Sequence, residues 1–207
     1  ADLSATDAPT ERKPFMLGRY GWVFYWLALI GFFLSMTAKT MSVPLPVALC
    51  VVIWWREGRV RRDDWLALVP FLMIAAVFSV ATIIFESRFT TARPGEISFT
   101  LAERIVISGR VFWFYLGKIL WPVPLAPVYP MFKIDAAAWW QYLPVVAAVA
   151  LAVAPVALRH RIGRGPAAAV LFFGVTVAPF LGIVDFALMF YTFVADRFVY
   201  LPIVGVL

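Results

Sequence analysis

Long apolar runs alternate with short charged turns along most of this chain. Such runs are typical of membrane helices, because crossing the hydrocarbon core takes about 20 apolar residues. Within the fifth run, Gly174, Ala178 and Gly182 recur every four residues, a spacing that favours close helix packing in lipid. The pattern predicts an all-α, polytopic integral membrane bundle with about five to six membrane segments. These segments are 20–38, 43–55, 65–85, 139–158, 167–184 and 198–207, the last being cut off by the end of the chain.

Residues 86–138 break this pattern. The stretch 101–121 predicts a helix that is amphipathic in its first half and mainly apolar in its second. Closely spaced prolines follow it and exclude a regular helix, so the stretch 122–130 should be extended. An extended backbone cannot return through lipid unpaired. We therefore expect an interfacial or re-entrant helix within an external loop spanning 86–138.

Composition agrees with a membrane protein. The chain has 207 residues, of which 63% are hydrophobic and 14% charged. This excludes a soluble enzyme, a disordered chain and a collagen-like fibre. Residues 1–19 are a polar N-terminal loop, and 20–207 form the transmembrane domain. Cys50 is the only cysteine, and no zinc-ligand spacing or phosphate-binding loop is present, so no metal site and no cofactor are identifiable in this chain.

The charges predict a topology. The turn REGRVRRDD (56–64) holds four arginines and the turn RHRIGR (159–164) holds three. Short arginine-rich loops stay in the cytoplasm, and the N-terminal loop fits the same side. Counting crossings from there puts ten further charged residues on the opposite face, where they favour binding of an anionic headgroup. They are Lys39, Arg88, Arg93, Glu96, Glu103, Arg104, Arg110, Asp185, Asp196 and Arg197.

Each candidate residue has a functional and a structural interpretation. Lys39 can neutralise a phosphate, or it can extend to the interface as an ordinary hairpin charge. Asp196 and Arg197 share a helical face with Tyr200, so they can grip a phosphate or form an ion pair that caps the next helix. Arg104, on the amphipathic helix, can support such a site or belong to a solvated polar face.

Three segments resemble one protein family. LSMTAKTMSVPLPVALCVVIWW resembles the "LSKE…PL" segment of the GT-C membrane glycosyltransferases, and VADRFVYLPIVGV resembles their "AERVLYLPS.G" signature. RVFWFYLGKILWPVPLAPVY is similar to the family's aromatic membrane helix and the "P..L" turn that follows it. The order matches across about 20–207, most closely in the transmembrane O-mannosyltransferases that carry tetratricopeptide repeats and in their bacterial relatives.

The resemblance implies a hexosyltransferase. Such enzymes move a sugar from a polyprenyl-phosphate-linked donor to a protein or lipid acceptor on the non-cytoplasmic face of the membrane. By position, Lys39 would contact the donor phosphate, and Asp196 and Arg197 would match the family's Glu–Arg pair, with Tyr200 in the same place. From the charges, we expect Arg197 to bind the phosphate as well, with Asp196, Tyr200 and Arg104 in support. Thr40 stands where the family commonly has Glu, and Asp196 replaces another Glu.

The resemblance also implies what the chain lacks. The catalytic residues are expected upstream of Ala1, and the repeat domain beyond Leu207, so this chain would be a fragment. A divalent metal is left open for the full-length enzyme. The expected location is the bacterial inner membrane, as a multi-pass protein in contact with lipid and without nucleic acid.

Two alternatives stay open. One is a lipid-linked-oligosaccharide polymerase or ligase, which uses similar substrates on the same face. The other is a non-enzymatic polytopic protein, either a transporter or an assembly subunit. The sugar, the acceptor, the catalytic base and the oligomeric state are not specified by these residues.

Overall fold

The computed structural model describes residues 21–89, 99–123, 126, 129–183 and 192–205, without the side chains of 86–89 and 197. These residues are helical and contain no β-strand. The α-helices are α1 (Gly21–Ala38), α2 (Leu45–Glu57), α3 (Arg62–Phe89), α4 (Leu101–Leu120), α5 (Leu143–Ala157), α6 (Arg159–Ile162) and α7 (Gly165–Val177). The 3₁₀ turns are η2 (Thr40–Ser42), η3 (Trp139–Tyr142), η4 (Ala178–Phe180), η6 (Asp196–Phe198) and η7 (Pro202–Gly205).

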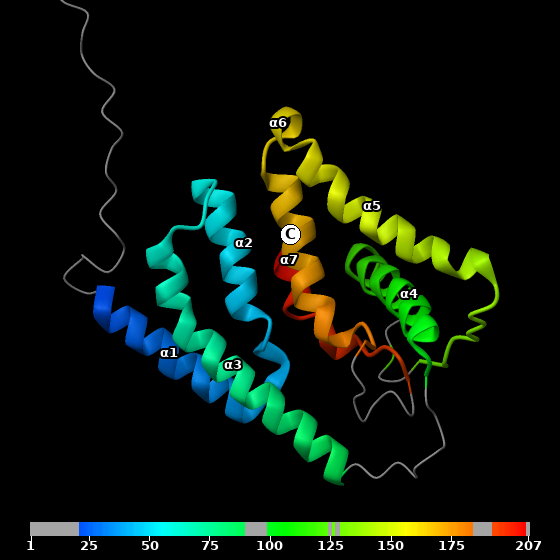
Figure 1. Ribbon diagram of the computed structural model, residues 1–207, viewed down its shortest axis with the longest axis horizontal. Helices are drawn as coiled ribbons and strands as arrows, with labels where there is room; N and C mark the ends of the chain where they lie inside the picture. Colours follow the sequence, from blue (N-terminus) through cyan, green and yellow to red (C-terminus); the bar gives the residue numbers. More distant parts are fainter. Residues whose placement is uncertain (1–20, 90–98, 124–125, 127–128, 184–191, 206–207) are drawn as a thin grey trace, which may run out of the picture.

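Helices α1 and α3 pack against each other (Figure 1). Their shared core is built from Phe32 and Met36 on α1 and Phe71 and Ala75 on α3. The Tyr25 hydroxyl of α1 also donates to the Ala67 carbonyl of α3 over 2.9 Å. We call this group the α1–α3 core.

A second, larger core lies among α4, α7 and the segment 192–199. Its buried side chains include Tyr115 on α4, Phe173 on α7 and Phe198 on η6. Helix α5 packs along α4 and α7, and η7 packs against α7. We call this group the C-terminal core, and the candidate functional residues adjoin it.

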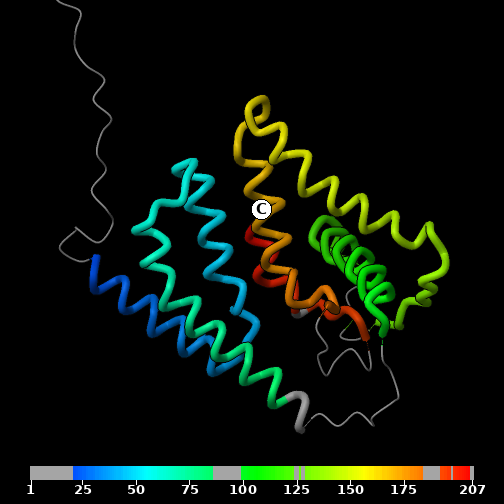
Figure 2. Tube along the Cα trace, viewed as in Figure 1, coloured from blue at the N-terminus to red at the C-terminus, as the bar shows by residue number. Residues whose placement is uncertain are grey.

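Helix α2 joins these two parts, because it packs closely against α7 as well as against α3 (Figure 2). Its buried Ala48, together with Ala167 and Ala168 on α7, leaves room for close approach of the two helices. Helix α2 ends at Gly58, which has a φ of 77°. Glycine adopts this left-handed conformation at little cost, so the chain can turn directly toward α3.

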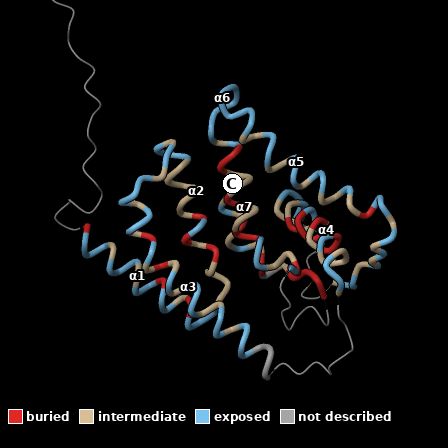
Figure 3. The backbone as a smooth tube through the Cα atoms, in the orientation of Figure 1, coloured by how far each residue is buried: buried red, intermediate tan, exposed pale blue. Residues whose placement is uncertain are grey.

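Within the part of the chain that the structure describes, three helical segments are long and apolar enough to cross a membrane: Gly21–Ala38, Arg62–Phe85 and Trp139–Ala157. Most of their surface is exposed, as expected for helices that face lipid (Figure 3). Helices α2 and α7 have 13 residues each. At 1.5 Å per residue this is about 20 Å, short of the about 30 Å of a hydrocarbon core. Three of the expected membrane segments therefore meet the requirement for crossing.

The expected helices at 20–38, 65–85 and 101–121 correspond to α1, α3 and α4 with small changes at their ends. Two expectations were wrong in detail. The turn 159–164 contains the short helix α6, and the described part of 198–207 forms 3₁₀ turns instead of a regular helix. The N-terminal loop 1–19, most of the polar stretch 86–98 and the loop residue Asp185 lie outside the described residues.

Candidate functional site

Lys39 lies at the junction of α1 and α2. Its backbone is extended, with φ −163° and ψ 131°, and it directly precedes η2. Its N–H still donates to the Ser35 carbonyl over 2.9 Å, so the residue is fixed to the end of α1 while its side chain is exposed. Two residues later, Met41 packs against the C-terminal core. This contact ties the Lys39 segment to the core that the other candidate residues adjoin.

Asp196 is half-buried at the start of η6, where its carboxylate receives two donors from one loop. The backbone N–H of Ala126 donates to Oδ2 over 2.8 Å. The hydroxyl of Tyr129 lies 3.0 Å from both Oδ1 and Oδ2. A carboxylate held in this way positions the chain around it, so Asp196 acts here as a clasp between two distant segments.

An aromatic ring and a cation of α4 pack against Tyr129 of this loop. The Tyr129 ring meets the Phe114 ring edge-on, with 4.8 Å between centroids. The Lys118 ammonium lies over both rings, 5.1 Å from the Tyr129 centroid and 5.6 Å from the Phe114 centroid. Both distances are within the range of cation–π attraction. We call Phe114, Lys118, Tyr129 and Asp196 the clasp cluster.

Arg104 joins the start of α4 to the chain that follows α7. Its Nε donates to the Phe99 carbonyl over 3.1 Å, and its Nη1 donates to the Ile183 carbonyl over 3.2 Å. Carbonyls without helical partners attract a guanidinium, which presents several donors in one plane. Arg104 is thus part of the packed structure at the edge of the candidate site, in contrast to the solvated polar face that was the alternative interpretation.

The expected grouping of Asp196 with Tyr200 on one helical face was wrong. Residues 196–198 form a 3₁₀ turn, which places side chains at i and i+4 on different sides. Tyr200 is 78% exposed, whereas Asp196 points into the clasp cluster. The side chain of Arg197 lies outside the described residues, so its expected contact with a phosphate is a prediction only.

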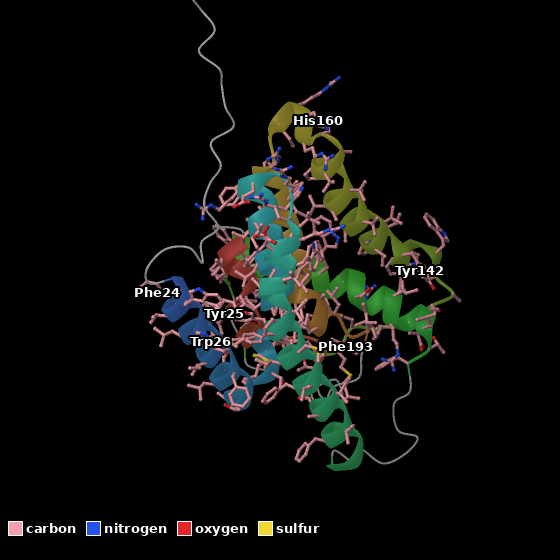
Figure 4. The ribbon with its side chains drawn as sticks, turned by 60° about the vertical axis from the view of Figure 1, so that its left-hand side comes forward. Phe24, Tyr25, Trp26, Tyr142, His160 and Phe193 are labelled. Atoms are coloured by element: carbon pink, nitrogen blue, oxygen red, sulfur yellow. The ribbon has the colours of Figure 1, made fainter. Side chains whose placement is uncertain are left out.

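The segment before Asp196 is held firmly in the C-terminal core. The Tyr115 hydroxyl of α4 accepts the N–H of Ala195 over 3.1 Å. Phe193 stacks on Phe132 at 5.9 Å and lies deep among the helices (Figure 4). Phe180 stacks on Phe198 at 4.3 Å and 12°. These contacts fix the backbone on both sides of Asp196.

Taken together, the three segments that carry the resemblance contact one core. Met41 represents the first, Phe114 and Tyr129 the second, and Ala195 with Phe198 the third. Among the residues that the structure describes, no group of three His, Cys, Asp or Glu side chains could hold a metal ion. The arrangement offers an exposed lysine on a segment that packs, through Met41, against the same core that the carboxylate clasp adjoins.

Sequence reasoning missed Lys118, Tyr129 and Tyr115 as functional neighbours. All three lie in RVFWFYLGKILWPVPLAPVY, the stretch already singled out for its resemblance. The available signal was a tyrosine among prolines, in a loop where an aromatic residue with a hydroxyl needs a partner.

Comparisons with known proteins add no relative. Among models of protein families, curated proteins and solved structures, none matches this chain.

Proposed function

We propose that the chain is a multi-pass protein of the bacterial inner membrane, with both arginine-rich turns in the cytoplasm. The three long apolar helices and their exposed surfaces support this proposal. The positive-inside rule gives the orientation. Helices α2 and α7 would then complete the bundle by packing on each other, although each is short.

Within that membrane domain, we propose a glycosyltransferase that moves a sugar from a polyprenyl-phosphate donor to an acceptor on the non-cytoplasmic face. One observation carries the proposal: Met41, Tyr129 and Phe198, from the three family-like segments, adjoin a single core. Met41 lies before α2 and Phe198 follows α7, so both are separated by a helix from the arginine-rich turns.

The proposed roles follow from charge. Lys39 is exposed and Arg197 follows the clasped Asp196, so both can supply positive charge to a donor phosphate. Positive charge held in place stabilises the phosphate as it departs from the sugar. Asp196 positions Arg197 through the backbone, and Arg104 fixes the edge of the site. A carboxylate elsewhere in the full-length protein would take the proton from the acceptor hydroxyl.

The test is transfer of a labelled hexose from a polyprenyl-phosphate donor by the full-length protein in proteoliposomes. Lys39→Ala and Arg197→Ala should each lower the rate by about a hundred- to thousandfold, as for other lost electrostatic contacts. Lys133→Ala is the matched control, because it removes an exposed cation outside the clasp cluster. Unchanged rates in both variants, with normal folding, would exclude the proposed site.

A further inference from the structure

The two arginine-rich turns meet at one end of the molecule. The turn 56–64 joins α2 to α3, and the turn 159–164 precedes α7. A Cβ placed on Gly58 would lie 2.5 Å from Cζ of Arg164, so the bare backbone of Gly58 makes room for that guanidinium. Figure 4 labels His160 on the α6 segment, at the same upper end of the molecule as the turn after α2. The two turns therefore form one surface.

This surface is strongly basic. The arginines in it are all exposed, and they outnumber its acidic residues by seven to three. Asp64 is already occupied, because its Oδ2 accepts the backbone N–H of Arg61 over 2.8 Å at the start of α3. Asp63 and Asp64 also lie in the first turn of α3, where negative charge stabilises the helix. The arginines are Arg56, Arg59, Arg61, Arg62, Arg159, Arg161 and Arg164.

The rim of the surface is apolar. Trp55 and Trp65 flank the first turn, Leu158 directly precedes the second and Ile162 lies within it; all four are exposed. Tryptophan at the edge of apolar helices is typical of the membrane–water interface. A soluble acidic partner would leave this rim in contact with water, whereas a bilayer covers it. The rim therefore favours a lipid as the ligand.

We propose that this surface binds the headgroups of anionic phospholipids in the cytoplasmic leaflet, with Arg164 lying against Gly58 between the two turns. The inference rests on the proposed membrane embedding and is independent of the glycosyltransferase activity. Basic surfaces between helices on the cytoplasmic side bind such headgroups, and each arginine near the membrane surface contributes about fivefold to binding. The guanidinium of Arg164, which lies against Gly58, supplies paired donors for one phosphate.

The experiment is native mass spectrometry of the chain in detergent, titrated separately with phosphatidylglycerol and phosphatidylcholine. We expect phosphatidylglycerol to bind more tightly. The double variant Arg59→Gln/Arg161→Gln should lose about 25-fold in its binding, because two exposed arginines are removed. Arg164→Lys should lose less affinity for phosphatidylglycerol, since lysine keeps the positive charge but lacks the planar guanidinium with its paired donors. Lys133→Gln is the control and should bind phosphatidylglycerol as the parent does, because Lys133 precedes α5 whereas the turn 159–164 follows it.

Three outcomes would overturn the inference. These are equal binding of the two lipids, undiminished binding by the double variant, and displacement of the lipid by free glycerol phosphate, which would indicate a site for soluble phosphate. Incorporation into nanodiscs of phosphatidylcholine alone tests the membrane embedding separately. A chain that enters neutral nanodiscs but shows no preference for phosphatidylglycerol would refute only the lipid site.

Discussion

The Tyr129 hydroxyl lies 3.0 Å from both carboxylate oxygens of Asp196, across 67 residues of sequence. It also accepts the N–H of Ala126 over 2.9 Å, and that same N–H lies 2.8 Å from Oδ2 of Asp196. The three groups form a closed triangle of hydrogen bonds. Through it, the chain after α4 is joined to the turn that carries Arg197.

Replacing Tyr129 by Phe should destabilise the fold by about 1–2 kcal/mol, because a hydrogen bond to a charged group is lost while the ring remains. Tyr200→Phe is the matched control, since Tyr200 is 78% exposed and its change should have little effect. Chemical unfolding in detergent measures both. Equal stability of the two variants would show that the triangle contributes nothing.

Two glycines on α4 should respond in opposite directions to alanine. A Cβ on Gly109 would lie 2.5 Å from Cγ2 and 2.7 Å from the backbone N of Val145 on α5, so Gly109→Ala should cost about 1–3 kcal/mol through overpacking. Gly117 has no such neighbour within 4 Å. Gly117→Ala should therefore stabilise the helix by about 0.5–1 kcal/mol. Thermal unfolding of the two variants measures this difference. A Gly109→Ala variant as stable as Gly117→Ala would show that the contact between α4 and α5 is loosely packed.

Acid should loosen the start of α4. Thr100 and Glu103 form a capping box, in which the Thr100 N–H donates to Glu103 Oε2 over 2.7 Å. These hydrogen bonds from Thr100 hold the pKa of Glu103 below its ordinary value of 4.5. The carboxylate therefore stabilises the fold above pH 4.5, and this contribution is lost as the pH falls through the lowered pKa.

Glu103→Gln provides the test of that pH dependence. The amide cannot titrate, so the variant should lack the part of the acid destabilisation that belongs to Glu103. Hydrogen exchange in the first turn of α4, followed as the pH is lowered, measures the effect. Identical acid profiles for the parent and the variant would contradict the assignment.

The two arginine-rich turns should be closed to reagents outside the cell. Single cysteines at Arg59 and Arg164, introduced after Cys50→Ala, should resist a membrane-impermeant thiol reagent in intact cells and react after the membrane is opened. The guanidinium of Arg164 lies against Gly58, so the two positions must agree with each other. A reaction from outside at either position would reverse the proposed orientation.

Local chemistry made much of the fold predictable. Apolar runs flanked by charged residues gave α1 and α3, and the threonine–glutamate pair before an apolar stretch marks the start of α4. The prolines after α4 correctly excluded a helix over the described part of 122–130. These features depend on neighbours in sequence, which a reader of the sequence can see.

Other features depend on distant partners. The row of Gly174, Ala178 and Gly182 predicted close packing of one helix, but α7 ends at Val177 and Gly182 has a φ of 76°. A close contact between two helices is found instead at Gly109 on α4, where the neighbouring residue Val145 belongs to α5. The hydrogen bond between Tyr129 and Asp196 could not be predicted either, because no periodicity in the sequence links these two residues. For the candidate site, the sequence predicted the segments but not their contacts.

Among the residues that the structure describes, the α1–α3 core and the C-terminal core share no buried residue, and α2 packs against both α3 and α7. Substitutions at Phe71 and at Phe173 should therefore add in their effects on unfolding, since neither side chain touches the other's neighbours. The contact between α2 and α7 is the main helix–helix contact that joins these two parts of the molecule. A relative motion of these two parts would therefore open the contact between α2 and α7, and it would also have to move Met41, which lies on η2 beside α1 and α3 and packs against the C-terminal core.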